Sequence, residues 1–152
     1  MFSDLFFYIF DGLNRDCKSE LEIIRTFSPF ENLVYRRPGQ DRALVLTFAE
    51  GIAMLEADKA EGHISAEDLA KLKSLGPESD PSTPVEKRLG SLVKQKYGVD
   101  FYFLDKYPSA VRPFYTMPDP ENPKLSNSYD FFSAFIVVAD CFFACHQNKI
   151  LC

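Results

Sequence analysis

The residues best suited to metal binding lie together near the C-terminal end of the chain. Cys141, Cys145, His146 and Cys152 supply three thiols and one imidazole, a combination that a tetrahedral zinc site accepts. In a helix, Cys141 and Cys145 would share one face because they are four residues apart. However, no two cysteines have the two-residue spacing typical of zinc sites, and the adjacency of Cys145 and His146 strains simultaneous ligation. We therefore predict that the chain holds no metal.

A second group of polar residues has the chemistry to bind an anionic ligand. Arg112 lies near the predicted sheet, and an arginine there can bind a carboxylate. Tyr115, Tyr129 and Asp130 are predicted to lie on the same sheet. The preferred interpretation is structural: an ion pair or an exposed edge position for Arg112, and packing or local hydrogen bonds for the other three. Arg112, Tyr129 and Asp130 are kept as candidates for substrate binding, and no residue is predicted to be catalytic.

The helices that surround these residues are indicated by periodicity and by capping pairs. Apolar residues recur every three or four positions from Phe6 to Phe27, which predicts one long amphipathic helix that ends at Ser28-Pro29. Three further helix starts show a hydroxyl residue three positions before a carboxylate, the arrangement of a capping box. These pairs are Thr47 with Glu50, Ser65 with Asp68, and Thr83 with Glu86. A polar, proline-rich loop lies between Leu75 and Pro84, and the segment 57–82 is therefore predicted to be a helical surface insertion outside the core.

Strands are predicted after Gly98, where the helical period ends. Asp100–Leu104 is an aromatic-rich strand, and Val111–Met117 is a second strand that Pro113 restricts to an edge or a bulge. A third strand is predicted from about Ser128 through Phe131. The short connections between these strands favour antiparallel pairing. The predicted fold class is α+β.

Composition and charge limit the functions that the chain can have. Its 152 residues suit one domain, and a net charge of -5 argues against a chain that grips nucleic acid by itself, because phosphate binding needs concentrated Lys and Arg. The apolar N-terminus lacks the basic region of a secretory signal, so a reducing, cytoplasmic location is expected. Residues 131–145 are too short and too polar to span a membrane, and we expect a sticky strand or helix on the exposed sheet.

Two strings are the most distinctive in the chain, RPFYTMPDP at 112–120 and SNSYD at 126–130. They resemble the catalytic domain of class II aspartyl-tRNA synthetases of the eukaryotic cytosolic and archaeal type. LFFYIFDGL at 5–13 is similar to the helix that follows the motif 2 hairpin of that family, and LTFAEGIAML at 46–55 also matches. From Ser133 the sequence departs from the Arg-Gly-Glu-Glu segment that the family has there. Residues 133–152 are therefore expected to be a divergent apolar tail.

The resemblance implies that residues 1–132 form part of a class II catalytic domain, whose large antiparallel sheet is flanked by helices. It implies a parent enzyme that uses ATP and Mg²⁺ to activate aspartate and then transfers the aspartyl group to tRNA. The three class II motifs that bind phosphate and serve dimerisation are expected to fall outside this chain. We therefore expect the chain alone to be inactive, to hold no cofactor and to bind no tRNA. The alternatives are an interaction module that binds the full-length synthetase, and a truncated product without function.

Overall fold

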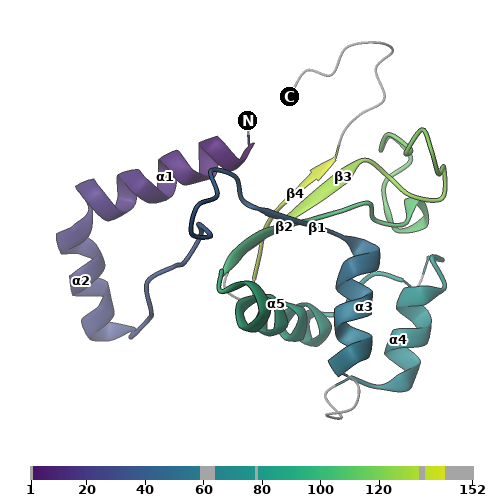
Figure 1. Cartoon of the computed structure of the whole chain (residues 1–152), viewed down its shortest axis with the longest axis horizontal. Coiled ribbons are helices and arrows are strands. Elements are labelled where there is room, and N and C mark those ends of the chain that lie inside the picture. The colour runs from purple at the N-terminus through teal and green to yellow at the C-terminus, as the bar shows by residue number, and fades with distance from the viewer. Residues whose placement is uncertain (1, 59–63, 78, 134–135, 143–152) are drawn as a thin grey trace.

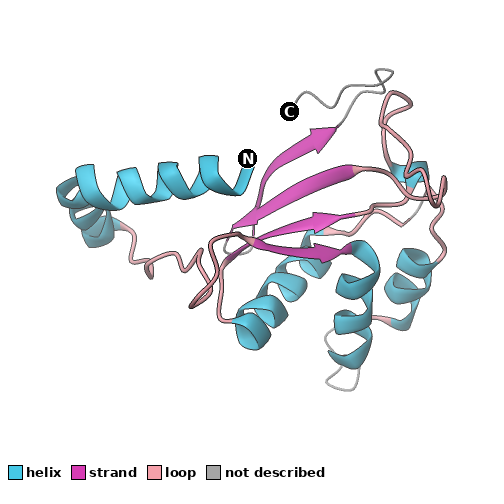
Figure 2. Ribbon diagram, turned by 45° about the horizontal axis from the view of Figure 1, so that its top comes forward, coloured by secondary structure: helices cyan, strands magenta, loops and turns pink. Residues whose placement is uncertain are grey.

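The computed structural model describes residues 2–58, 64–77, 79–133 and 136–142 of the chain, which form a four-stranded sheet with helices on both faces (Figures 1 and 2). The strands lie in the order β1-β2-β3-β4 and have these bounds: Leu44–Thr47, Phe101–Asp105, Ser128–Ser133 and Ile136–Phe142. β1 pairs in parallel with β2, whereas β2 with β3 and β3 with β4 pair antiparallel. The α+β class is confirmed, and the sheet is mixed where an antiparallel one was expected.

The two faces of the sheet carry separate apolar cores because successive side chains of a strand point to opposite sides. All five residues of β2 are buried. Phe101 and Phe103 belong to one core, which lies under helix α1 (Phe2–Asp16). Tyr102 and Leu104 belong to the other core, which lies under three helices on the opposite face of the sheet. β2 is thus the central element of the molecule.

The α1 side of the sheet is packed almost entirely by aromatic rings. The ring of Phe6 lies 5.1 Å from those of Phe101 and Phe131, and Phe10 meets Phe101 edge-on at 5.1 Å. Tilted and edge-to-face contacts of this kind are the preferred arrangements of aromatic side chains. Many aromatic residues of the chain therefore lie in one layer, between α1 and the strands β2 and β3.

The opposite face is covered by α3 (Phe48–Asp58) and α5 (Thr83–Tyr97), with α4 (Ala66–Lys73) packed outside α3. Gly51 allows α3 to approach closely, since a Cβ there would lie 3.3 Å from a methyl group of Leu89. Ile64, Leu69 and Leu72 are buried in this core. The prediction that segment 57–82 lies outside the core is therefore wrong, because its apolar residues pack against α3. Whether the segment is an insertion stays a prediction.

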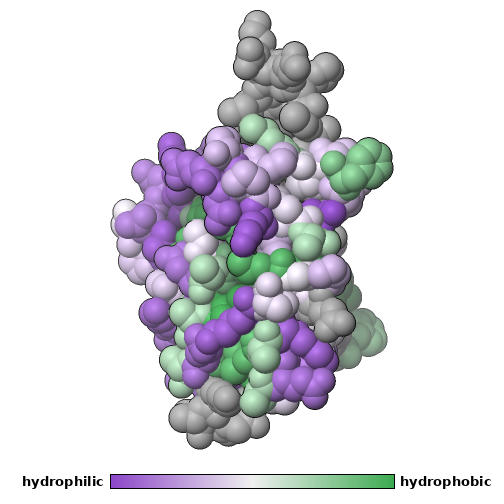
Figure 3. All heavy atoms as spheres, turned by 90° about the vertical axis from the view of Figure 1, so that its right-hand side faces the viewer, coloured by the Kyte–Doolittle hydropathy of each residue, from purple (hydrophilic) through white to green (hydrophobic). Residues whose placement is uncertain are grey.

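Figure 3 shows the side of the molecule that lies on the right in Figure 1, where a strip of apolar side chains runs between hydrophilic ones. Lys73 forms an ion pair with Glu56 across α4 and α3, and Arg88 of α5 donates to Asp58 at the end of α3. The Arg88 Nε lies 2.6 Å from an oxygen of the buried Asp58 carboxylate. These ion pairs connect the three helices around their apolar contacts.

Two of the three predicted capping pairs are present. The hydroxyl of Thr47 accepts the backbone N–H of Glu50, and the Glu50 carboxylate accepts the backbone N–H of Thr47 at 2.7 Å. Ser65 accepts the backbone N–H of Asp68 at 3.0 Å. The third predicted cap, Thr83, is wrong by one residue: Thr83 is the first residue of α5, and Ser82 occupies the N-cap position. The C-terminal end at Gly98 is confirmed by a left-handed backbone with a φ of 69°.

The N-terminal helix is divided where a continuous one was predicted. α1 ends at Asp16, and α2 (Lys18–Phe27) begins after Cys17, whose φ and ψ of -116° and 29° lie outside the helical region. Hydrogen bonds still cross the break, from the N–H of Cys17 to the carbonyl of Leu13 and from Leu21 to Cys17. The helix therefore bends sharply at this point, and the predicted end near Phe27 is confirmed.

The strand predictions are confirmed in part. β2 and β3 lie within one or two residues of the predicted bounds and pair antiparallel. Within the predicted apolar tail, residues 136–142 form β4 as a strand of the same sheet. β1 was not predicted. Val111–Met117 is not a strand, because it contains the end of a short 3-10 helix (Ser109–Val111) followed by turns. Pro113 removes a backbone donor there, and turn hydrogen bonds take the place of a ladder.

Candidate functional site

Two of the four candidate residues, Arg112 and Tyr115, lie in the connection between β2 and β3, residues 106–127, which we call the β2–β3 connection, and the other two, Tyr129 and Asp130, lie in β3. The connection has little regular structure, but isolated bridges join Pro108 to Leu125 and Pro118 to Ser126. The carbonyl of Tyr107 accepts the backbone N–H of Ser126 at 2.8 Å and its hydroxyl at 3.0 Å. The two ends of the connection are therefore tied together next to the sheet, which gives its side chains defined positions.

A buried ion pair joins the β2–β3 connection to the sheet. Nη2 of Arg112 lies 2.6 Å from Oδ2 of Asp130, and the two side chains are only 6% and 7% exposed. The Arg112 guanidinium also lies over the ring of Tyr107, with its Cζ 3.8 Å from the ring centroid. Asp130 pairs with Leu104 across the ladder, so its carboxylate lies on the α3 and α5 face of the sheet. The structure thus brings two candidate residues, Arg112 and Asp130, into direct contact.

The aromatic residue Tyr107 is part of the environment of the Arg112–Asp130 ion pair. Burial raises the pKa of the Tyr107 hydroxyl well above its ordinary value, and the negative charge of Asp130 adds to that effect. The Tyr107 phenol is therefore neutral, and its ring packs against Phe48 with 5.0 Å between centroids. The Asp130 carboxylate and the Tyr107 ring face both attract the buried guanidinium, which offsets part of the cost of removing its charge from water. The structural ion pair expected for Arg112 is present.

The third candidate residue, Tyr129, lies on the other face of the sheet. It pairs with Asp105 across the ladder and forms a side-chain hydrogen bond with it. Burial raises the pKa of Asp105, although the backbone N–H and the charge of Lys106 and the Tyr129 bond oppose this effect. Lys106 has a left-handed φ of 60°, and its ammonium is held by Asp119 at 3.1 Å and by Asn127 at 2.6 Å. A second polar cluster therefore holds the β2–β3 connection from the α1 side.

The tip of the β2–β3 connection presents two aromatic side chains to solvent. Phe114 is 99% exposed, and Tyr115 is half-exposed with its ring 5.4 Å from that of Phe114. The expectation that Tyr115 packs on the sheet is therefore wrong, since the segment around Pro113 turns away from the strands.

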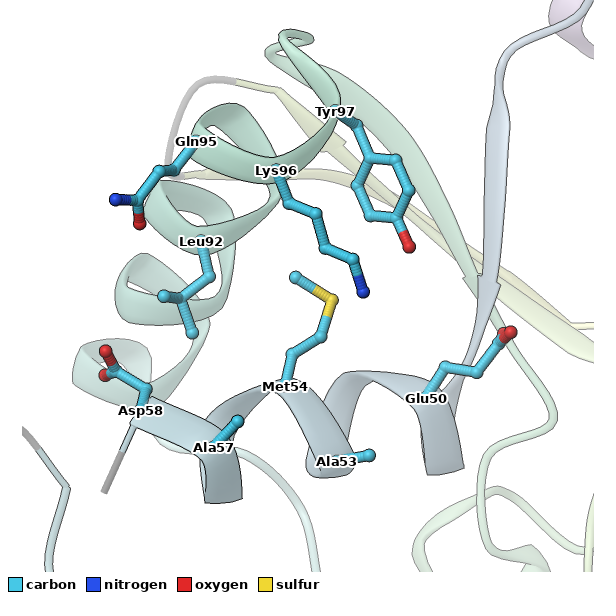
Figure 4. Close-up of a pocket in the computed structure, with 9 residues that line it drawn as sticks. All are labelled: Glu50, Ala53, Met54, Ala57, Asp58, Leu92, Gln95, Lys96 and Tyr97. Atoms are coloured by element: carbon cyan, nitrogen blue, oxygen red, sulfur yellow. The ribbon is translucent and has the colours of Figure 1, made fainter. Parts of the chain in front are cut away.

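The structure also contains a pocket of about 480 Å³ between α3 and α5. Figure 4 shows that Met54, Lys96 and Tyr97 point into it, whereas the Glu50 carboxylate points away from it. That carboxylate forms the cap of α3, and the backbone N–H of Thr47 lowers its pKa. Lys96 is the one cation among the residues that line the pocket. A single cation is too little positive charge to hold the phosphates of a nucleoside triphosphate, so these residues do not fit such a ligand with its Mg²⁺.

Metal binding finds no support in the part of the chain that the structure describes. No group of three or more His, Cys, Asp or Glu residues there has an arrangement that could hold a metal ion. Cys145, His146 and Cys152 lie outside the described residues, and the prediction made for them stays a prediction. The same described part contains no helix that is long and apolar enough to cross a bilayer.

Comparison with known proteins identifies the family. The family model described as tRNA synthetases class II (D, K and N) matches residues 1–151. This chain belongs to the class II tRNA synthetases. The match runs through most of residues 133–152, and the divergence predicted for that segment stays a prediction.

The relatives of this class II chain are named as aspartyl enzymes. It is 45% identical over 130 residues to the cytoplasmic aspartate–tRNA ligases of Bos taurus and Homo sapiens, which covers 86% of this chain and 23% of each relative. Among solved structures, the aspartyl-tRNA synthetase from Entamoeba histolytica is 43% identical with a TM-score of 0.71, over 90% of this chain and 24% of that one. A putative aspartyl-tRNA synthetase from Leishmania major is 29% identical with a TM-score of 0.73, over 91% and 30%. The chain thus spans about a quarter of these relatives.

The site of this synthetase chain contains residues that sequence reasoning did not single out. Lys106, Asp119 and Tyr107 join the candidate residues because the β2–β3 connection folds back on itself. A usable signal was the density of prolines in that connection, at positions 108, 113, 118, 120 and 123, which favours turns over a strand.

Proposed function

We propose that this chain forms part of the catalytic domain of a cytoplasmic aspartate–tRNA ligase, and that it does not aspartylate tRNA by itself. The observation that carries this proposal is the 45% identity to cytoplasmic aspartate–tRNA ligases over 130 residues, combined with a coverage of only 23% of their length. The two strings quoted above contain Arg112 and Asp130, which form the buried ion pair. The same residues that carry the resemblance thus hold the β2–β3 connection in place.

The proposed inactivity follows from the charges that adenylate formation requires. Attack of the aspartate carboxylate on ATP releases pyrophosphate, and both the transition state and the leaving group need preorganised cations. Three basic side chains beside the sheet are already paired with carboxylates of this chain: Arg112 with Asp130, Lys106 with Asp119, and Lys94 with Asp100. Removing one preorganised contact typically lowers a rate by ~100- to 1000-fold. The chain alone would lack several.

Within a whole ligase, the candidate residues would have different roles. Arg112 and Asp130 are buried, so we assign them to positioning β3 and the β2–β3 connection beside the substrate. Tyr129 is only partly buried and lies beside Asp105, so it is the most accessible of the three. ATP, Mg²⁺ and tRNA would be bound largely by parts of the ligase that this chain does not include.

The test is pyrophosphate exchange with aspartate and ATP on the purified chain. We expect no exchange above a blank without protein, while the cytoplasmic ligase of Homo sapiens assayed in parallel gives a strong signal. Robust, aspartate-dependent exchange by the chain alone would contradict the proposed inactivity. It would leave the family assignment intact.

A second candidate function, an interaction module for the full-length synthetase, is favoured by one observation. Among the described strands, β1 lies at the edge of the sheet, and its outer backbone groups have no ladder partner there. An extended segment of another chain can pair with such an edge. Stoichiometric co-purification with the intact ligase supports this function. A transcript without detectable protein would instead indicate a product without function.

A further inference from the structure

The pocket between α3 and α5 combines an apolar floor with a single cation. Its volume of about 480 Å³ lies within the range of roughly 300–1,000 Å³ that is typical of small-molecule sites. The apolar part of its lining comes from both helices: Ala53, Met54, Ala57, Leu92 and the ring of Tyr97. Met54, Leu92 and Tyr97 also pack against the apolar core, so the floor of the pocket is continuous with that core. Figure 4 shows that the Lys96 ammonium points into the same space, beside the Met54 side chain.

The pocket follows from the residue spacing on the two helices. Ala53 and Ala57 are four residues apart and therefore lie on one face of α3, and Leu92 and Lys96 are related in the same way on α5. An alanine side chain is a single methyl group, so these two positions leave space between the helices unfilled. On the core side, by contrast, Gly51 lets α3 approach α5 closely. The helices thus meet on one side and stay apart on the other.

The carboxylates at the two ends of the pocket are already engaged. The Glu50 carboxylate accepts the backbone N–H of Thr47 at 2.7 Å, and the Asp58 carboxylate accepts a hydrogen bond from Nε of Arg88 at 2.6 Å. Among the described residues, no carboxylate forms an ion pair with Lys96. The pocket therefore presents one positive charge that this part of the chain does not pair.

These groups define the chemistry of a ligand. One ammonium matches one negative charge, and a carboxylate supplies that charge together with two acceptor oxygens. The Tyr97 ring, whose centroid lies 5.2 Å from the Lys96 ammonium, and the apolar floor match a ring or a branched alkyl group that leaves water on binding. A second negative charge on the ligand would have no cation to face, and an organic cation would be repelled by Lys96.

We propose that this pocket binds a small monocarboxylate with an apolar body, whose carboxylate contacts the Lys96 ammonium while its body lies between Met54 and Leu92. This inference does not depend on the proposed function, which assigns ATP and tRNA to other parts of a ligase. Aspartate does not fit the pocket, because it carries two carboxylates and no apolar body.

Titration with phenylacetate, followed by NMR of a chain with ¹³C-labelled methionine methyl groups, tests the proposal. Met54 lines the pocket, and Met117 lies in the β2–β3 connection, where it serves as an internal reference. We expect the Met54 methyl resonance to shift and saturate with a dissociation constant near ~1 mM, which is usual for a ligand of about ten non-hydrogen atoms. The Met117 resonance should not move, and aspartate should shift neither. Phenylacetamide, which has the same size and no charge, should bind ~5-fold more weakly.

Three variants assign the binding to particular groups. Lys96→Met should weaken phenylacetate binding ~5-fold and leave phenylacetamide binding almost unchanged, because only the charged ligand uses the ammonium. Lys87→Met is the matched control, since Lys87 is exposed on the same helix and does not line the pocket. Ala57→Leu fills the pocket and should abolish the Met54 shift. An unchanged Met117 resonance and an unchanged far-UV circular dichroism spectrum check that each variant is folded.

Several results would overturn the proposal. One is the absence of a saturable Met54 shift at ~20 mM phenylacetate, far above the expected dissociation constant. Others are equal affinities for phenylacetate and phenylacetamide, or a loss on Lys87→Met as large as that on Lys96→Met. Binding that persists in Ala57→Leu would place the ligand elsewhere and would overturn it as well.

Discussion

Replacement of Arg112 by Met should severely destabilise the chain. The substitution keeps an apolar stem of similar length but leaves the Asp130 carboxylate, which is 7% exposed, without its ion-pair partner at 2.6 Å. Breaking a buried pair by removing one partner costs about 3–5 kcal/mol. The contact of the guanidinium with the Tyr107 ring at 3.8 Å is lost in the same change. At ~2–4 °C per kcal/mol for a chain of this size, we expect Tm to fall by roughly 10 °C.

The assay is urea denaturation followed by far-UV circular dichroism, together with a thermal melt. Arg15→Met is the matched control, since Arg15 forms an ion pair with Asp16 at 2.7 Å but is 69% exposed. Exposed pairs contribute about 0–1 kcal/mol, so the control should leave the midpoint almost unchanged. The double variant Arg112→Met with Asp130→Leu should regain much of the lost stability, because it removes both buried charges.

This reasoning about the Arg112–Asp130 pair has a clear point of failure. If Arg112→Met costs no more than Arg15→Met, the pair does not hold the β2–β3 connection. If the double variant is as unstable as the sum of the two single variants, the carboxylate and the guanidinium are not energetically coupled.

Two further predictions concern backbone conformation and pH. Gly98→Ala should destabilise the chain by ~1 kcal/mol, because Gly98 has a left-handed φ of 69°. Gly12→Ala should stabilise the chain by ~0.5–1 kcal/mol, because Gly12 lies inside a helix and nothing lies within 4 Å of an added Cβ. The two substitutions should shift the urea midpoint in opposite directions, and shifts in the same direction would contradict this prediction. Burial raises the pKa of Asp105 above 3.8 in the folded chain. The folded state therefore binds that proton more tightly than the unfolded state, and the free energy of unfolding falls as pH rises from about 3.8 through the folded pKa. Asp105→Asn should remove this decrease in unfolding free energies measured at several pH values, and an unchanged pH profile would contradict the prediction.

The features that sequence could predict are those that depend on neighbouring residues. The caps at Thr47 and Ser65 each need only two side chains three positions apart, and both are present. The strand around Phe101 follows from a local run of aromatic residues. By contrast, β1 has only four residues and runs directly into α3, so its alternation is too short to distinguish it from the start of a helix.

The candidate site was predictable in its residue types but not in its geometry. Arg112 and Asp130 stand out by their chemistry, and the ion pair expected for Arg112 exists. Its partner could not be inferred, because that required knowing that Val111–Met117 is not a strand and that the connection folds back onto β3. Tyr129 and Asp130 are adjacent in sequence, yet they face opposite sides of the sheet, since side chains of a strand alternate.

The parallel pairing of β1 with β2 has a consequence for the order in which the molecule assembles. It joins residue 44 to residue 102, whereas the pairing of β2 with β3 joins residue 105 to residue 129. The longer loop costs more chain entropy to close, and it contains three helices. We therefore expect the parallel pairing of β1 to form after the antiparallel pairing of β2 with β3, and to open before it.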